Sequence, residues 1–212
     1  IFTFAKPGQK ASAVRGKRTG AYMTIKEIVK LSATYLGLYD VLTLLAKTDG
    51  TGGISGGDEA GVKETNLLTL CANIIVNELA CTYFPMIKTE TKNTVNGKIL
   101  FSELSENVTE IKRVENAAGR EIPYVSGFDG IEVSESAAVI TYRFSPPNYG
   151  LDETVAFKED IPLRITAYGV CAEYCLTEKN FDESVMWRNR FVNSLCEFVK
   201  PENKRIKERS FI

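Results

Sequence analysis

The stretch from Asp160 to Val199 constrains the fold most, because its pattern predicts two helices joined by a very short turn. Apolar residues fall on nearly every side of the first helix, which is typical of a buried helix. They are Leu163, Ile165, Ala167, Val170, Cys171, Tyr174, Cys175 and Leu176. The second helix has one aromatic and aliphatic face, made of Trp187, Phe191, Leu195 and Phe198. We expect this hairpin to form the centre of a helical bundle, with a core that includes Tyr168, Cys171, Cys175, Trp187, Phe191 and Leu195.

The ends of the two helices have recognisable signals. Asp160 is the expected N-cap of the first helix, and Pro162 suits its first turn, where no N–H donor is needed. Asn180 suits a left-handed exit from that helix, and Asp182 is the expected N-cap of the next. Pro201 prevents much further helix.

Helical patterns also precede this hairpin. Thr24 is the expected cap of a helix that breaks at Gly37 and continues to about Lys47. Residues 48–61 contain six glycines and predict a flexible loop. A long helix follows over 62–84. Its expected apolar face consists of Leu67, Leu70, Cys71, Ile74, Ile75, Leu79 and Tyr83.

Between Met86 and Tyr149 the apolar pattern changes to a period of two, which predicts five or six short strands. One hairpin is expected around Asn96-Gly97, a favoured turn dipeptide, and a second across residues 108–125. Two more strands are expected in residues 130–145.

The predicted fold class is α+β. A bundle of about four helices, over residues 24–85 and 160–199, is interrupted by a small antiparallel β-rich insertion over 86–159. Extended basic arms are expected at 1–23 and 200–212.

The net charge of −1 is unevenly distributed. Residues 1–22 carry +5, from Lys6, Lys10, Arg15, Lys17 and Arg18, and residues 200–212 carry +3, which leaves −9 for residues 23–199. Basic arms on an acidic body suggest that the arms dock elsewhere, including on copies of the same body. The second arm mixes basic and apolar side chains, which suits a groove with apolar pockets and an acidic rim. Its candidate docking residues are Lys204, Arg205, Ile206, Lys207, Arg209, Phe211 and Ile212.

The sequence has no histidine, which removes histidine-dependent triads and zinc sites. All five cysteines fall in predicted helices, and we interpret them as small buried hydrophobes rather than disulfides or metal ligands. The glycine-rich loop lacks the Lys-Ser/Thr pair of a phosphate-binding loop. No metal, cofactor or catalytic residue is predicted, no run is long enough to span a membrane, and residues 1–22 do not resemble a signal peptide. We expect the protein not to be an enzyme.

The Asp160–Val199 stretch resembles the C-terminal hairpin of head–tail connector (adaptor) proteins from tailed bacteriophages and prophages. The shared features are the proline-led helix at Pro162, Ala167-Tyr168, Ala172-Glu173-Tyr174, the short polar turn and Trp187. Helices before a β-rich insertion are similar to that family as well. The resemblance covers 24–199 in architecture and about 160–198 in sequence, and the basic N-terminal arm and the length of the β block depart from it.

The resemblance implies a structural virion protein of the neck, assembled in the host bacterial cytoplasm and used in viral genome ejection. Such subunits form a ring, usually of twelve copies, beneath the portal protein; their C-terminal arms commonly dock onto the portal. The ring extends the DNA channel, through which DNA passes without specific binding, and meets a stopper or tail-completion protein.

Two alternatives stay open. A tail-terminator or stopper-type neck protein would form a ring that is typically six-fold. A nucleic-acid-binding module would use the basic N-terminal arm, through phosphate contacts that weaken as salt rises.

Overall fold

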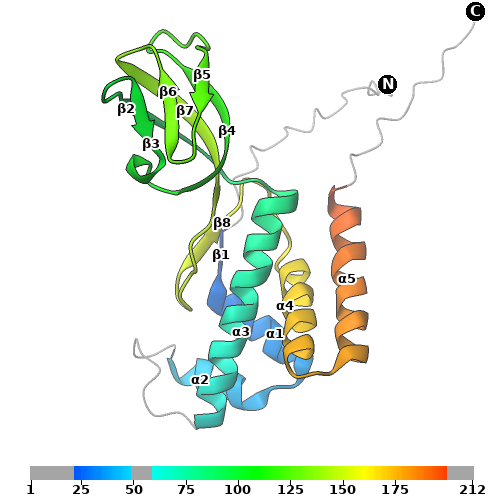
Figure 1. The fold of residues 1–212 in the computed structure, drawn as a ribbon. Coiled ribbons are helices and arrows are strands. Elements are labelled where there is room, and N and C mark those ends of the chain that lie inside the picture. The colour runs from blue at the N-terminus through cyan, green and yellow to red at the C-terminus, as the bar shows by residue number, and fades with distance from the viewer. Residues whose placement is uncertain (1–21, 49–58, 200–212) are drawn as a thin grey trace, which may run out of the picture.

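The computed structural model describes residues 22–48 and 59–199 (Figure 1). Within them the chain has the predicted α+β fold, a helical bundle interrupted by small antiparallel sheets. The bundle has five helices where the sequence predicts about four, because Gly37 ends α1 before α2 begins. The helices lie together at one end of the molecule, and the sheets inserted between α3 and α4 form a β module at the other end (Figure 1). The helices are α1 (Ile25–Leu36), α2 (Tyr39–Thr48), α3 (Glu59–Glu78), α4 (Leu163–Thr177) and α5 (Phe181–Val199).

Helix α1 begins and ends at the residues that the sequence indicates. The Thr24 hydroxyl accepts from the Glu27 N–H at 3.1 Å, and the Glu27 carboxylate accepts from the Thr24 N–H at 2.9 Å, which makes a capping box. Gly37 ends the helix with φ 71°, a conformation that glycine adopts without steric cost.

Helix α4 begins later than predicted. Its N-cap is Pro162, with extended φ and ψ of −60° and 128°, and Asp160 makes no cap. The residue before a proline is disfavoured in the helical region, so Ile161 stays outside the helix and is instead buried in the core.

The turn between α4 and α5 is one residue shorter than predicted. Lys179, with φ 62°, takes the left-handed position that the sequence assigns to Asn180. The Asn180 N–H donates to the Cys175 carbonyl at 2.8 Å, and the Lys179 N–H donates to the Leu176 carbonyl at 3.1 Å, which is a Schellman motif. Helix α5 therefore starts at Phe181, and Asp182 lies in its first turn rather than at the N-cap.

Helix α3 starts at Glu59, three residues before the predicted start, and its last turn widens into the π-helix η1 (Leu79–Tyr83). The face that it buries agrees with the prediction in part: Cys71, Ile75 and Leu79 are buried, and Leu67 and Tyr83 pack against the core. Leu70 and Ile74 are 56% and 45% exposed, so they are not part of the core. The buried side chains are Thr65, Leu68, Cys71, Ala72, Ile75, Val76 and Leu79.

The β module holds two three-stranded antiparallel sheets, with strand orders β2-β7-β4 and β3-β6-β5. The strands are β2 (Ile87–Asn93), β3 (Lys98–Leu100), β4 (Asn107–Glu115), β5 (Tyr124–Ser126), β6 (Gly130–Val133) and β7 (Ala137–Ser145). A short 3₁₀ turn, η2 (Phe101–Glu103), follows β3. A separate hydrophobic core fills this module, with Ile99, Val114, Ile131, Ile140 and Tyr142 among its buried residues.

The two predicted hairpins are wrong as complete hairpins. Asn96 and Gly97 do form a tight turn, with φ 54° and 76°, but β2 then pairs with β7 while β3 pairs with β6. Likewise β4 pairs with β7 and β5 with β6. Each turn thus passes the chain from one sheet to the other, because both sheets must cover the shared core.

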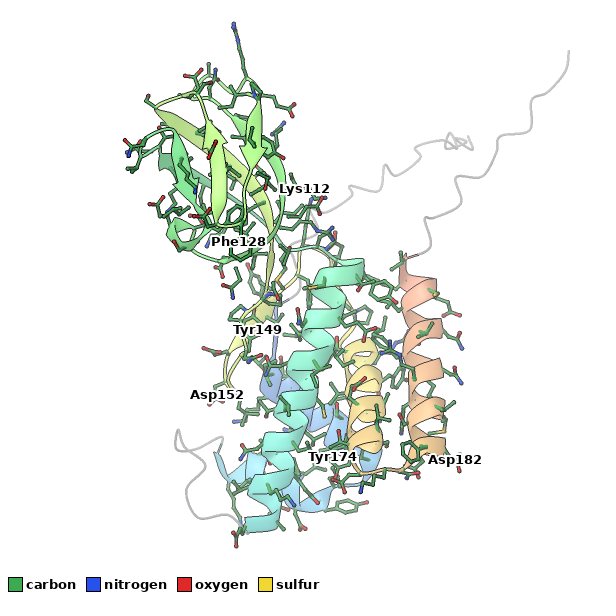
Figure 2. The ribbon with its side chains drawn as sticks, in the orientation of Figure 1. Lys112, Phe128, Tyr149, Asp152, Tyr174 and Asp182 are labelled. Atoms are coloured by element: carbon green, nitrogen blue, oxygen red, sulfur yellow. The ribbon has the colours of Figure 1, made fainter. Side chains whose placement is uncertain are left out.

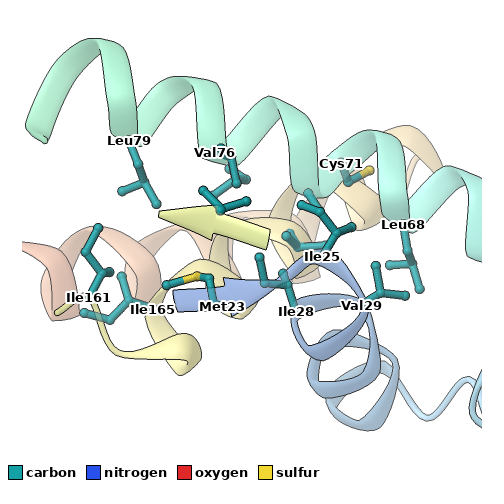
Figure 3. Packing of buried hydrophobic residues seen from close by; sticks show 14 of the residues in the cluster. Met23, Ile25, Ile28, Val29, Leu68, Cys71, Val76, Leu79, Ile161 and Ile165 are labelled. Carbon is teal, nitrogen blue, oxygen red and sulfur yellow. The ribbon is translucent and has the colours of Figure 1, made fainter. Parts of the chain in front are cut away.

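A pair of strands that the sequence does not predict ties the N-terminal side of α1 to the chain before α4. Strand β1 (Tyr22–Thr24) pairs with β8 (Thr154–Ala156). The predicted arm over 1–23 therefore includes two residues of a strand, and Met23 is only 4% exposed. Met23 packs near Ile25, Ile161 and Ile165 (Figure 3).

Candidate assembly interface

One side of α5 carries apolar side chains that the bundle does not bury. Phe181, Val185 and Val199 are 61%, 60% and 48% exposed, and Val192 is half-buried. Their spacing of four, seven and seven residues places them on one stripe of the helix. The core-facing residues, such as Phe191, lie on a different side of α5. Helix α5 therefore has a second apolar face.

Helix α3 carries a similar stripe. Leu70 and Ile74 are exposed, and Leu67 is half-buried one turn before them. In Figure 1, α4 lies between α3 and α5. Leu176, in the last turn of α4, is 48% exposed.

An ion pair shows that the two stripes face the same side of this three-helix layer. Both guanidinium nitrogens of Arg188 on α5 donate to the Glu78 carboxylate on α3, at 2.8 and 2.6 Å. Arg188 lies between Val185 and Val192 in the α5 stripe, and Glu78 lies one turn after Ile74. We call the exposed residues Leu70, Ile74, Phe181, Val185 and Val199 the apolar face. The half-buried Leu67 and Val192 border it and pack against the core. This face is the candidate assembly surface.

The six residues predicted for the bundle core lie at the contacts of α4 and α5. Cys171, Cys175, Trp187, Phe191 and Leu195 are buried, and Tyr168 is half-buried. The ring of Trp187 stacks with those of Tyr168 and Tyr35, with centroids 5.8 and 5.7 Å away. These residues pack α1, α4 and α5 against one another. They fix the positions of the helices and are not part of the apolar face.

The cysteines divide into two groups. Burial raises the pKa of Cys171 to about 12, and that of Cys71 and Cys175 to about 11, so these thiols stay protonated near neutral pH. Cys81 and Cys196 are exposed, which corrects the prediction that all five are buried. Among the described residues, no group of three or more Cys, Asp or Glu side chains is placed to hold a metal ion.

A groove lies at the junction of the bundle and the β module. Its volume is about 640 Å³, and its lining residues are Tyr22, Pro85, Met86, Ile87, Phe144, Ala156, Phe157 and Lys158. A smaller hollow of about 250 Å³ shares Tyr22 and includes two carboxylates, Glu27 and Asp160. The periodicity of the sequence gives no signal for this groove, because its walls come from segments far apart in the chain.

The predicted docking residues of both arms, Lys6 to Arg18 and Lys204 to Ile212, lie outside the described residues. The apolar face itself was missed by sequence reasoning, although the recurrence of Phe181, Val185, Val192 and Val199 is a readable signal. In Figure 2, Tyr174 marks α4 and Asp182 marks the start of α5, where this stripe begins.

No helix of the described part of the chain combines the length and apolarity needed to cross a membrane. No protein-family model matches the chain, and no curated protein matches it either.

Proposed function

We propose that the protein is a structural subunit of the neck of a tailed bacteriophage or prophage, a head–tail connector (adaptor). In this proposal copies pack side by side into a ring beneath the portal. The ring extends the DNA channel and offers a surface to a stopper or tail-completion protein. The subunit acts by assembly and not by catalysis.

The apolar face supports this proposal most directly. It consists of Leu70 and Ile74 on α3, and of Phe181, Val185 and Val199 along α5. In water such a face is costly, and covering it with a second copy is favourable at roughly 25 cal/mol per Å² of apolar surface removed. A contact between this face and a different surface of the next copy is heterologous, and a heterologous contact generates a ring when its rotation closes.

The second support is the division between the two packed units. The bundle and the β module each have their own hydrophobic core. The bundle can therefore pack against neighbouring copies while the β module stays available for another partner.

Electron microscopy of the purified full chain tests this function, alone and mixed with the portal protein of the same virus. We expect closed rings with a central channel, of twelve copies. Particles that never enter a ring in either sample would contradict the proposal. Six-fold rings would instead support the tail-terminator or stopper alternative.

A further inference from the structure

The groove at the junction lies close to the point where the described part of the chain ends. Phe198, near the end of α5, packs its ring against Phe84, with centroids 5.8 Å apart. Phe84 in turn packs against Phe157, at 6.4 Å, and Phe157 lines the groove. Residues 200–212 therefore leave the body only two ring contacts away from the groove.

The groove suits a peptide with both apolar and polar side chains. Phe157 and Met86 are buried beneath it, whereas Tyr22 and Ile87 are 75% and 52% exposed at its rim. Segment 200–212 carries three large apolar side chains, of Ile206, Phe211 and Ile212. Thirteen residues in extended form span roughly 40 Å, so the segment is long enough to run along the groove.

The charges also match. The hollow that adjoins the groove at Tyr22 carries the carboxylates of Glu27 and Asp160. Segment 200–212 has five basic and two acidic side chains. Lys158 lines the groove itself, so it repels the basic side chains there and favours their placement at the carboxylate end.

We propose that this groove binds the chain's own segment 200–212, with apolar side chains in the groove and basic side chains near Glu27 and Asp160. The covalent link between segment 200–212 and its own body favours this segment over that of a second copy as the occupant of the groove. A short linker gives an attached segment an effective concentration in the millimolar range, far above that of a free copy in dilute solution. The inference goes beyond the proposed function, because it requires no ring and applies to a single copy.

Photocrosslinking of the full chain tests this site. Phe211 is replaced by benzoylphenylalanine, and ¹⁴N- and ¹⁵N-labelled copies are mixed before illumination. We expect crosslinks to peptides that contain Met86, Ile87 or Phe157, between fragments that carry the same isotope. Crosslinks between unlike isotopes would assign the groove to the segment of a second copy and overturn the proposal, as would crosslinks confined to other surfaces.

A matched pair of variants on β8 tests the groove itself. Ala156→Arg places a bulky cation in it, and we expect at least a tenfold loss of these crosslinks. Thr154→Arg introduces the same side chain at an exposed position of the same strand, outside the groove lining, and we expect the wild-type yield. Equal yields in the two variants would overturn the proposal.

Hydrogen exchange gives a readout without the crosslinker. In the variant Phe211→Ser/Ile212→Ser, peptides covering 85–87 and 156–158 should exchange several-fold faster than in wild type. The control Asn203→Ala should leave exchange unchanged. Unchanged exchange in the double variant would contradict docking in the groove. Both readouts report docking within one copy whether or not the chain forms rings, so failure of ring assembly and failure of segment docking are told apart.

Discussion

At the scale of single residues, Glu90 is the most perturbed carboxylate of the β module. Its side chain is 14% exposed. This partial burial raises its pKa, but hydrogen bonds from Ser105, Tyr142 and Lys92 outweigh burial and lower the pKa to about 2. The Tyr142 hydroxyl donates to the carboxylate at 2.5 Å, and the Lys92 ammonium lies 3.4 Å from it.

The lowered pKa makes the stability of the fold pH-dependent. A carboxyl whose pKa is lower in the folded state stabilises the fold above its ordinary pKa of 4.5, and this stabilisation is lost as pH falls toward about 2. In Glu90→Gln the drop in unfolding free energy between pH 7 and pH 3 should be smaller by about 1 to 2 kcal/mol, allowing for solvent screening. Urea unfolding at several pH values measures this. Glu121→Gln, at an exposed site, is the control, and an equal drop in wild type and Glu90→Gln would refute the assignment.

Individual residues also mark where sequence reasoning is reliable. Thr24 and Gly37 were predicted correctly, because capping depends on side-chain and backbone chemistry within a few residues. Asp160 and Asn180 were not. Each has the right chemistry, but Pro162 and the short turn place the helix ends one or two residues away.

At the scale of elements, helix α3 shows the limit of periodicity. Its length and most of its core face were predicted, since Cys71, Ile75 and Leu79 are buried. Leu70 and Ile74 were wrongly included, because α3 has apolar residues on two sides and only one packs against α1 and α4. Similarly, the strands of the β module were predicted while their partners were not. Which strands pair depends on how the two sheets close around their shared core, and a local sequence pattern does not determine that.

The turn between β5 and β6 is an element with a sharp steric requirement. A Cβ on Gly130 would lie 2.3 Å from the Ile99 carbonyl oxygen, a backbone atom that β-pairing holds in place. A Cβ on Gly127 would lie 3.4 Å from the Gly130 carbonyl oxygen, an ordinary contact. The turn holds Phe128 fully exposed (Figure 2).

We therefore predict a large loss of stability for one glycine substitution and almost no change for the other. Gly130→Ala should lower the free energy of unfolding by about 3 kcal/mol, since the strands must separate to admit the methyl group. Gly127→Ala should change it by less than about 0.5 kcal/mol. Urea denaturation, monitored by circular dichroism, measures the free energy of unfolding of both variants. Similar stabilities for the two variants would contradict the close approach of the Ile99 carbonyl oxygen to Gly130.

At the scale of the whole molecule, the fold class was predictable from the sequence, and the proposed assembly surface was not. The order of helices, strands and helices follows from local periodicity. The apolar face depends on which side of α3 and α5 the bundle leaves open, and the groove depends on distant segments meeting at Tyr22. The apolar face and the groove therefore both result from tertiary packing, which a local sequence pattern does not show.

Native mass spectrometry shows whether the apolar face holds copies together in a ring. The full chain should give a species of about 282 kDa, which is twelve times the 23.5 kDa chain. Leu70→Glu/Val185→Glu should give the 23.5 kDa monomer, because the contact would bury unpaired carboxylates.

The matched control introduces the same two charges at exposed apolar positions of the β module, away from the apolar face, in Val95→Glu/Val125→Glu. We expect this control to keep the mass of the wild-type assembly. A full chain that stays monomeric at every concentration, or a Leu70→Glu/Val185→Glu variant that still forms the wild-type assembly, would contradict the account.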